Sequence, residues 1–131
     1  MKIKKYSLIV VVILLFGCSA AVVVNDKVVG ISSGKFIYED GNLSTQFKAD
    51  IELVWQAVEK AVVDLRGWNI QKDRGISSGS IKTIISDEPV TIRVNYIGKD
   101  LTSVSIFCGV VGNQMASRII MDKIAFHLGK P

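Results

Sequence analysis

Residues 89–109 read PVTIRVNYIGKDLTSVSIFCG. Apolar and polar side chains alternate in both halves of this segment, which is the pattern of β-strands that bury one face. Gly98, Lys99 and Asp100 lie between the halves and favour a turn, so the segment is predicted to form an antiparallel hairpin. One face carries the side chains that we expect in the core: Val90, Ile92, Val94, Tyr96, Val104, Ile106 and Cys108. The opposite face is mostly polar, which predicts a sheet that is covered on one side only.

The cover is predicted to be helical. Residues 51–65 carry apolar side chains, Trp55 among them, at the spacing of one helical face. Asp50 precedes this segment and is expected to cap the helix through its side chain. Arg66 is expected in the last turn, and Gly67 is the predicted stop signal.

A second helix is predicted over residues 113–128, with Asn113 as its cap. Its apolar face is expected to contain Ala116, Ile120, Ile124 and Leu128, flanked by Met115 and Ile119. The remaining predicted strands are a hairpin over residues 35–48 and two strands over residues 68–74 and 79–86. The predicted fold class is therefore α+β, a two-layer sandwich in which an antiparallel sheet carries two helices on one face, in the order β-hairpin, α, β, β, β, β, α.

The composition agrees with one small folded domain. The chain has 131 residues, of which 49% are hydrophobic and 21% charged, and it contains 2 prolines. It is too short for a TIM barrel, which needs roughly 200 residues or more. Large catalytic architectures are thereby excluded.

The N-terminal segment has the layout of an export signal. Three lysines precede an unbroken apolar run over residues 8–16, and small residues follow it. The sequence Leu15-Phe16-Gly17-Cys18 resembles a bacterial lipobox, in which a signal peptidase cleaves between Gly17 and Cys18 and the cysteine sulfur carries diacylglycerol. Cys18 is thus the predicted lipidation site, and this covalent lipid would anchor the chain to a membrane. No other cofactor is expected.

On this interpretation residues 1–17 are a signal peptide, residues 18–34 the lipidated cysteine and a tether, and residues 35–131 a single domain. The expected location is the bacterial cell envelope, and Ser19 after the cysteine favours the outer membrane with the domain facing the periplasm. The alternative is an uncleaved single-span anchor, because residues 8–24 reach the lower length limit of a membrane helix. Both interpretations place the domain outside the cytoplasm.

Charge and cysteine content exclude two further classes. Of 16 Lys and Arg residues, three lie within residues 1–17, which leaves 13 against 12 Asp and Glu in the mature chain. This balance lacks the concentrated basic stripe of nucleic-acid-binding proteins, so no nucleic-acid partner is expected. With Cys18 acylated, Cys108 is the one remaining cysteine, so neither a disulfide nor a metal site is expected.

The sequence contains a weak serine-hydrolase pattern. Gly-Ile-Ser-Ser-Gly occurs at residues 30–34 and again at residues 75–79, and both copies match G-x-S-x-G. That motif needs its serine between a strand and a helix, with a histidine and an acid in reach, whereas both copies lead into predicted strands. Ser32 and Ser77 are therefore expected in turns, and no enzymatic activity is expected.

Three further features have competing interpretations. His127 is expected to be structural, since a charged histidine is favourable at a helix C-terminus, rather than a metal ligand. Cys108 is expected to behave as a small buried hydrophobe rather than as a reactive thiol. Residues 109–112 are expected to form a strand-to-helix turn rather than an anion site, because no basic residue adjoins them before Arg118.

The open face of the sheet is the candidate interaction surface. Its predicted residues are Lys82, Thr91, Arg93, Asn95, Ser103, Ser105 and Phe107. Such a face is either an ordinary solvated surface or a site for a partner protein, a glycan or a lipid headgroup.

Four motifs carry a resemblance that covers nearly the whole chain. They are Ser78-Gly79-Ser80-Ile81, Pro89-Val90-Thr91-Ile92, Val104-Ser105-Ile106 followed by Gly109 and Gly112, and Ser117-Arg118-Ile119-Ile120. With the lipobox, they resemble an uncharacterised family of small bacterial envelope lipoproteins, classed as a domain of unknown function. The resemblance implies an envelope lipoprotein and supplies no catalytic residues. The expected function is a non-catalytic, membrane-anchored interaction module with an envelope protein or cell-wall partner, and the alternative is a binder of cell-wall glycan or lipid.

Overall fold

The computed structural model describes residues 36–129. They form six strands and two helices: β1 (Ile37–Glu39), β2 (Asn42–Phe47), α2 (Ile51–Asp64), β3 (Trp68–Arg74), β4 (Ser78–Ile85), β5 (Glu88–Gly98), β6 (Leu101–Cys108) and α3 (Gln114–His127). The predicted signal peptide, Cys18, the tether and Ser32 lie outside the described residues.

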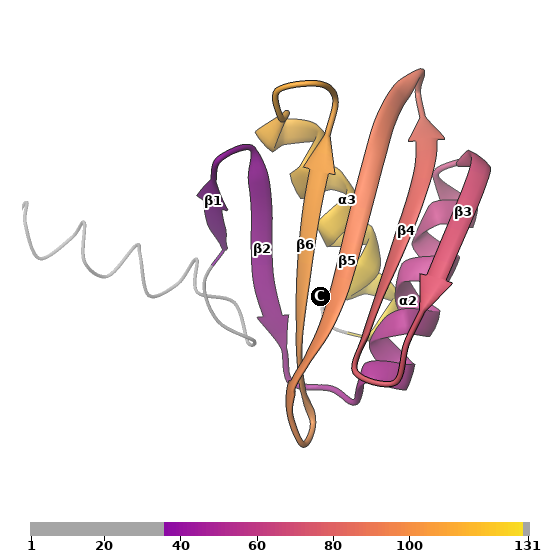
Figure 1. The fold of residues 1–131 in the computed structure, drawn as a ribbon. Coiled ribbons are helices and arrows are strands. Elements are labelled where there is room, and N and C mark those ends of the chain that lie inside the picture. The colour runs from indigo at the N-terminus through magenta and orange to yellow at the C-terminus, as the bar shows by residue number, and fades with distance from the viewer. Residues whose placement is uncertain (1–35, 130–131) are drawn as a thin grey trace, which may run out of the picture. The chain divides into compact units, whose positions relative to one another are not determined.

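The strands make one antiparallel sheet in the order β1-β2-β6-β5-β4-β3. Both helices lie on the same side of it (Figure 1). The α+β fold class and the order of elements are therefore confirmed. The central hairpin, β5 and β6, occupies the middle of the sheet because β2 pairs with β6 and β4 pairs with β5.

The core lies between the sheet and the helices. Alternate residues of β2, β4, β5 and β6 point into it, which is why these strands show a period of two in their burial. Val54, Val58 and Val62 from α2 and Ile120 and Ile124 from α3 complete the core. Two buried threonines link the core to the backbone on either side of α2. Thr83 donates to the carbonyl of Trp68 and Thr102 to that of Ala49, both at 2.8 Å.

The C-terminus of α2 is closed by a Schellman motif. The amide of Arg66 donates to the carbonyl of Val63 at 3.0 Å, and the amide of Gly67 donates to that of Val62 at 2.9 Å. Arg66, with φ of 59°, takes the left-handed position where glycine is commonest. The helix thus ends before Arg66, which was expected inside the last turn. The side chain of Asp50 makes no capping hydrogen bond, so the expected side-chain cap is wrong.

Two expectations about burial are wrong. Tyr96 is 49% exposed rather than buried, although it pairs with the buried Thr102; the register of β5 shifts directly after it, between Tyr96 and Gly98. Met115 and Ile119 are 77% and 55% exposed, although they were expected beside the buried face of α3. The residues of α3 that are buried are Ser117, Ile120, Met121 and Ile124.

Strand β3 is the edge of the sheet next to α2, and six of its seven residues are exposed. Its pairing with β4 is interrupted between Trp68 and Gln71, where Asn69 has a φ of 53°. Lys72 pairs with Glu59 of α2 at 2.7 Å, and Arg74 pairs with Glu52. Ion pairs therefore connect β3 to α2, whereas the inner strands contact the helices through apolar side chains.

Candidate functional site

The seven residues predicted for the interaction surface all lie on the face of the sheet opposite the helices. The register aligns them in transverse rows, because residues paired across antiparallel strands share a face. One row contains Ser44, Ser105, Arg93, Ser80 and Asp73. The rows on either side contain Asn42, Phe107, Thr91, Lys82 and Gln71, and Gln46, Ser103, Asn95 and Ser78. No described helix covers this face, which we call the open face (Figure 1).

A hollow of about 280 Å³ lies at the β3, β4 and β5 side of the open face. Its lining includes Asp73, Ser80, Arg93 and Asn95. A carboxylate, a hydroxyl, a guanidinium and an amide thus meet at one place, and together they offer both hydrogen-bond donors and acceptors. The sequence analysis identified Arg93 and Asn95. Asp73 was not predicted, because the sequence of β3 has no clear alternation of apolar and polar residues. Its carboxylate makes this region less cationic than the sequences of β5 and β6 indicate.

Phe107 is only partly available as a contact residue. A Cβ atom placed on Gly41 would lie 2.6 Å from Cε2 of its ring, so the ring is packed under the turn between β1 and β2. Gly41 has a φ of 81° and Asp40 a φ of 52°, the conformation of a tight two-residue hairpin turn. The expected exposed aromatic side chain on the open face is therefore half-buried.

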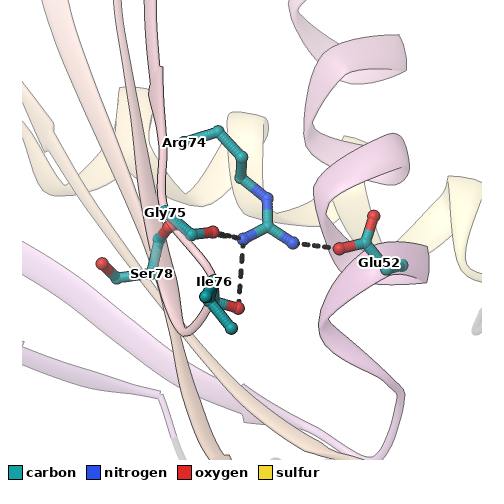
Figure 2. Close-up of polar contacts among 5 residues, drawn as sticks. All are labelled: Glu52, Arg74, Gly75, Ile76 and Ser78. Atoms are coloured by element: carbon teal, nitrogen blue, oxygen red, sulfur yellow. Dashed lines mark hydrogen bonds and ion pairs between the residues drawn. The ribbon is translucent and has the colours of Figure 1, made fainter.

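The loop between β3 and β4 lies within the second copy of the Gly-Ile-Ser-Ser-Gly repeat, whose last two residues begin β4. Arg74 binds the carbonyl groups of this loop (Figure 2). One guanidinium nitrogen, Nη1, donates to the carbonyls of Gly75, Ile76 and Ser78, while Nη2 pairs with Glu52 of α2. The guanidinium also lies 5.5 Å from the centroid of the Trp55 ring. A cation–π contact and four polar contacts therefore fix a loop whose tip, Ile76, is 97% exposed.

This geometry does not fit a nucleophile elbow at Ser77. The serine lies in a hairpin between two antiparallel strands, whereas a nucleophile elbow requires a strand-to-helix turn. The prediction of a turn at Ser77 is confirmed. The copy at residues 30–34 lies outside the described residues.

Cys108 is buried, with 1% of its surface exposed. Burial raises the pKa of its thiol; the Ser117 hydroxyl beside it lowers the pKa, and the charge of Glu88 raises it. The Ser117 hydroxyl makes no hydrogen bond of normal geometry within the described chain, so its contact with the thiol is a weak one. The expected burial of Cys108 is confirmed, and the raised pKa keeps it a protonated thiol at neutral pH.

His127 contacts a partner that the sequence did not indicate. Its Nε2 lies 2.5 Å from Oδ2 of Asp64, the last residue of α2. This contact joins the C-terminal ends of both helices. No cluster of three or more metal-ligating side chains occurs within residues 36–129, and no described helix is long and apolar enough to cross a membrane.

The connection between β6 and α3 is a strand-to-helix turn, as expected. Asn113 caps α3, since its side-chain oxygen accepts from the amide of Ala116 at 3.1 Å. Gly109 and Gly112 both have positive φ and bracket two exposed valines, Val110 and Val111. Both valines were expected in this turn, but the turn prediction alone does not indicate that their side chains form a contact surface.

The chain matches the family described as "Protein of unknown function (DUF3568)" over residues 3–126. It belongs to this family, whose match covers every described strand and nearly all of α3. A search of curated proteins finds no match.

Proposed function

We propose that this member of the family is a non-catalytic lipoprotein of the bacterial cell envelope that binds a partner protein through the open face. The anchor is supported by the lysines, apolar run and lipobox of residues 1–18. The family match begins at residue 3 and so includes most of this segment. The proposed location is the outer membrane, with the domain in the periplasm.

The observation that carries the binding role is the arrangement of the open face. A six-stranded sheet presents three rows of polar side chains with Arg93 near their centre. Arginine is enriched at protein interfaces because its planar group makes several directed hydrogen bonds. The sheet holds these groups on a rigid backbone, which lowers the entropy lost on binding.

The hollow favours a second candidate, a cell-wall glycan or a lipid headgroup. Sugar hydroxyls act as both donors and acceptors, and the groups around the hollow offer both. Its volume lies near the lower end of the range for small-ligand sites, so it would hold one or two sugar units rather than a long chain.

The anchor is tested by mass spectrometry of the N-terminal peptide from native membranes. The expected peptide begins at Cys18 and carries the mass of a diacylglyceryl group and an amide-linked acyl chain. Cys18→Ala should leave the protein unacylated with its signal uncleaved. A peptide that begins at Met1 with an unmodified Cys18 would contradict the lipoprotein proposal.

The binding role is tested by photo-crosslinking from a reactive amino acid at position 95 in intact cells, followed by purification of the adducts. Arg93→Glu should abolish a discrete protein adduct. Lys60→Glu is the matched control, because it makes the same charge change at an exposed site on α2, on the opposite side of the molecule. Phe107→Ala is unsuitable on its own, since the ring also supports the β1–β2 turn.

A binding assay with purified protein separates the two candidates. Direct binding of purified protein to isolated cell-wall fragments or lipid, lost on Arg93→Glu and Asp73→Asn, favours the second. Equal adduct patterns for wild type, Arg93→Glu and Lys60→Glu would contradict the first candidate, and binding of cell-wall fragments or lipid that Arg93→Glu leaves unchanged would contradict the second.

A further inference from the structure

Four large apolar side chains are strongly exposed within ten residues around the start of α3. Val110 is 88% exposed, Val111 84% and Met115 77%, and Ile119 is exposed one turn further along the helix. Tyr38 of β1 lies beside them: a Cβ atom on Gly112 would be 2.9 Å from the Tyr38 hydroxyl. We call Tyr38, Val110, Val111, Met115 and Ile119 the α3 patch. Exposed apolar side chains that lie together on a surface mark a site of contact with a membrane or with another molecule.

The patch has a fixed shape. The loop that carries Val110 and Val111 packs on the turn between β1 and β2, because a Cβ atom on Gly112 would lie 2.4 Å from the Cα atom of Gly41. A groove of about 380 Å³ between β1 and α3 continues the patch and is lined by Phe36, Tyr38, Leu43, Met115 and Ile119, among others. The valines are therefore held outward on a rigid support rather than being free to fold onto the core.

The polypeptide enters the domain at this patch. Phe36, the first described residue, lines the groove, and its ring lies 4.0 Å from the guanidinium carbon of Arg118. Cys18 precedes Phe36 by 18 residues, a length of chain that can span at most about 60 Å. An anchor at Cys18 therefore keeps the patch within reach of one bilayer leaflet, at a high effective concentration.

The charges indicate how the patch would bind. Arg118 is engaged by Asp122 at 3.2 Å and by the Phe36 ring, and Glu39 and Asp40 lie at the rim on the β1–β2 turn. Among residues 36–129, these charged groups leave no excess of positive charge beside the patch, so attraction to anionic headgroups would be weak. Apolar side chains and a tyrosine at the rim suit the boundary between headgroups and acyl chains.

We propose that the α3 patch inserts into the lipid leaflet that holds the anchor, so that the domain rests on the membrane in one orientation. This inference rests on the lipoprotein function proposed above. It adds a second contact, made by residues 38 and 110–119, to the covalent one at Cys18. Insertion depends on apolar contact and changes little with ionic strength.

The first experiment measures contact in the acylated protein. Single cysteines replace Val111, Met115 or, as the control, Ile76, in a Cys108→Ala background, and each is labelled with an environment-sensitive fluorophore. Ile76 is as exposed as the patch residues but lies in the β3–β4 loop. In phosphatidylethanolamine vesicles, labels at 111 and 115 should shift to shorter wavelength and be quenched by spin-labelled acyl chains, whereas the label at 76 stays aqueous.

The second experiment uses residues 18–131 with Cys18→Ser, which cannot be acylated. Val111→Asp with Met115→Asp should weaken its partitioning into the same vesicles at least about tenfold, equivalent to about 1.4 kcal/mol, and Ile76→Asp should not. Positions 76, 111 and 115 are all strongly exposed, so circular dichroism should show equal folding.

The outcomes separate this proposal from the one on which it rests. Acylated Cys18 with aqueous labels at 111 and 115 overturns patch insertion and leaves the lipoprotein function intact. Unmodified Cys18 in native cells overturns the proposed anchor. In that case the vesicle partitioning of the unacylated chain still tests whether the α3 patch inserts into lipid. Partitioning that requires anionic lipid and vanishes in salt would also overturn insertion by apolar contact.

Discussion

At the scale of single residues, Gly79 illustrates a requirement that the sequence hides. It lies in β4 under the indole of Trp55, and a Cβ atom there would be 2.6 Å from Cζ3 of the ring. Gly79 appeared to be part of a turn motif, yet its role is to let Trp55 of α2 approach the sheet. Contacts between residues 24 positions apart in the chain leave no local signal.

Gly79→Ala is expected to destabilise the protein by about 1–3 kcal/mol, because the added methyl group must displace a buried indole. Gly98→Ala is the matched control: no atom lies within 4 Å of the added carbon, and its effect should stay within about 0.5 kcal/mol. Urea denaturation of both variants measures the difference. Equal midpoints would contradict the packing described for Trp55.

Cys108 gives a prediction for pH dependence. Its pKa is raised in the folded protein, so as pH rises above about 8.5 the unfolded chain releases the thiol proton first. The stability that the protonated thiol contributes is complete below that pH and is lost as pH rises through the folded pKa. Wild type should therefore lose more stability between pH 7 and pH 10 than Cys108→Ala, measured by urea midpoints at each pH. Parallel losses would show that the thiol does not take part.

The sequence predicted which face the residues of β5 and β6 occupy, since a period of two follows from strand geometry alone. It failed where local geometry changes. Tyr96 is half exposed just before a register shift, and Arg66 takes a left-handed conformation that is uncommon for arginine. Neither change has a residue type that signals it.

At the scale of elements, α2 is the main support of the sheet. Its apolar face packs on β4, β5 and β6, and Trp55 lies at its N-terminal end against Gly79 and Arg74. Trp55→Ala should cost about 3–5 kcal/mol through the cavity it leaves. Gln56→Ala, an exposed neighbour on the same helix, should change the free energy of unfolding by less than about 0.5 kcal/mol. Thermal and urea unfolding of the pair provide the measurement.

Strand β3 is less well supported than the inner strands of the sheet. It contributes no residue to the buried core, and its two ion pairs with α2 are solvent-exposed, so each is worth about 0–1 kcal/mol. Amide hydrogens of β3 should therefore exchange faster than those of β5 and β6, which open only with the whole domain. Hydrogen exchange with mass spectrometry of peptides 66–74 and 88–108 tests this. Equal protection would show that β3 is held by contacts stronger than ion pairs.

Element boundaries were predictable to within one or two residues, because turns and caps carry specific residue types. The order of strands in the sheet was not. Only the β1–β2, β3–β4, β4–β5 and β5–β6 pairs are neighbours in the chain, and the pairing of β2 with β6 joins residues 42–47 to residues 102–107. That pairing attaches the β1–β2 hairpin to the rest of the sheet, and it depends on packing across the whole core.

At the scale of the whole molecule, both helices and the four inner strands share one core. Unfolding should therefore be a single cooperative transition. Tryptophan fluorescence, which reports on the α2 side, and far-ultraviolet circular dichroism, which reports on all elements, should give coincident urea curves. A separate early transition in fluorescence alone would indicate that α2 and β3 unfold as their own unit.

The candidate site was predictable in part from the geometry of β-strands. The open face follows from the alternation in β5 and β6, and the structure places all seven predicted residues on it. The α3 patch was not predictable, because its exposure depends on how α3 rotates on the sheet: Met115 and Ile119 fit either side of an apolar stripe when only spacing is considered.

The interrupted pairing of β3 also bears on self-association. A long regular strand at the rim of a sheet is a template on which a neighbouring molecule can add its own strand, and repetition of that step builds fibrils. Here the kink at Asn69 leaves only Gln71–Arg74 in continuous register, and three of these four residues carry charge. This edge is therefore a poor template for strand addition by a second copy.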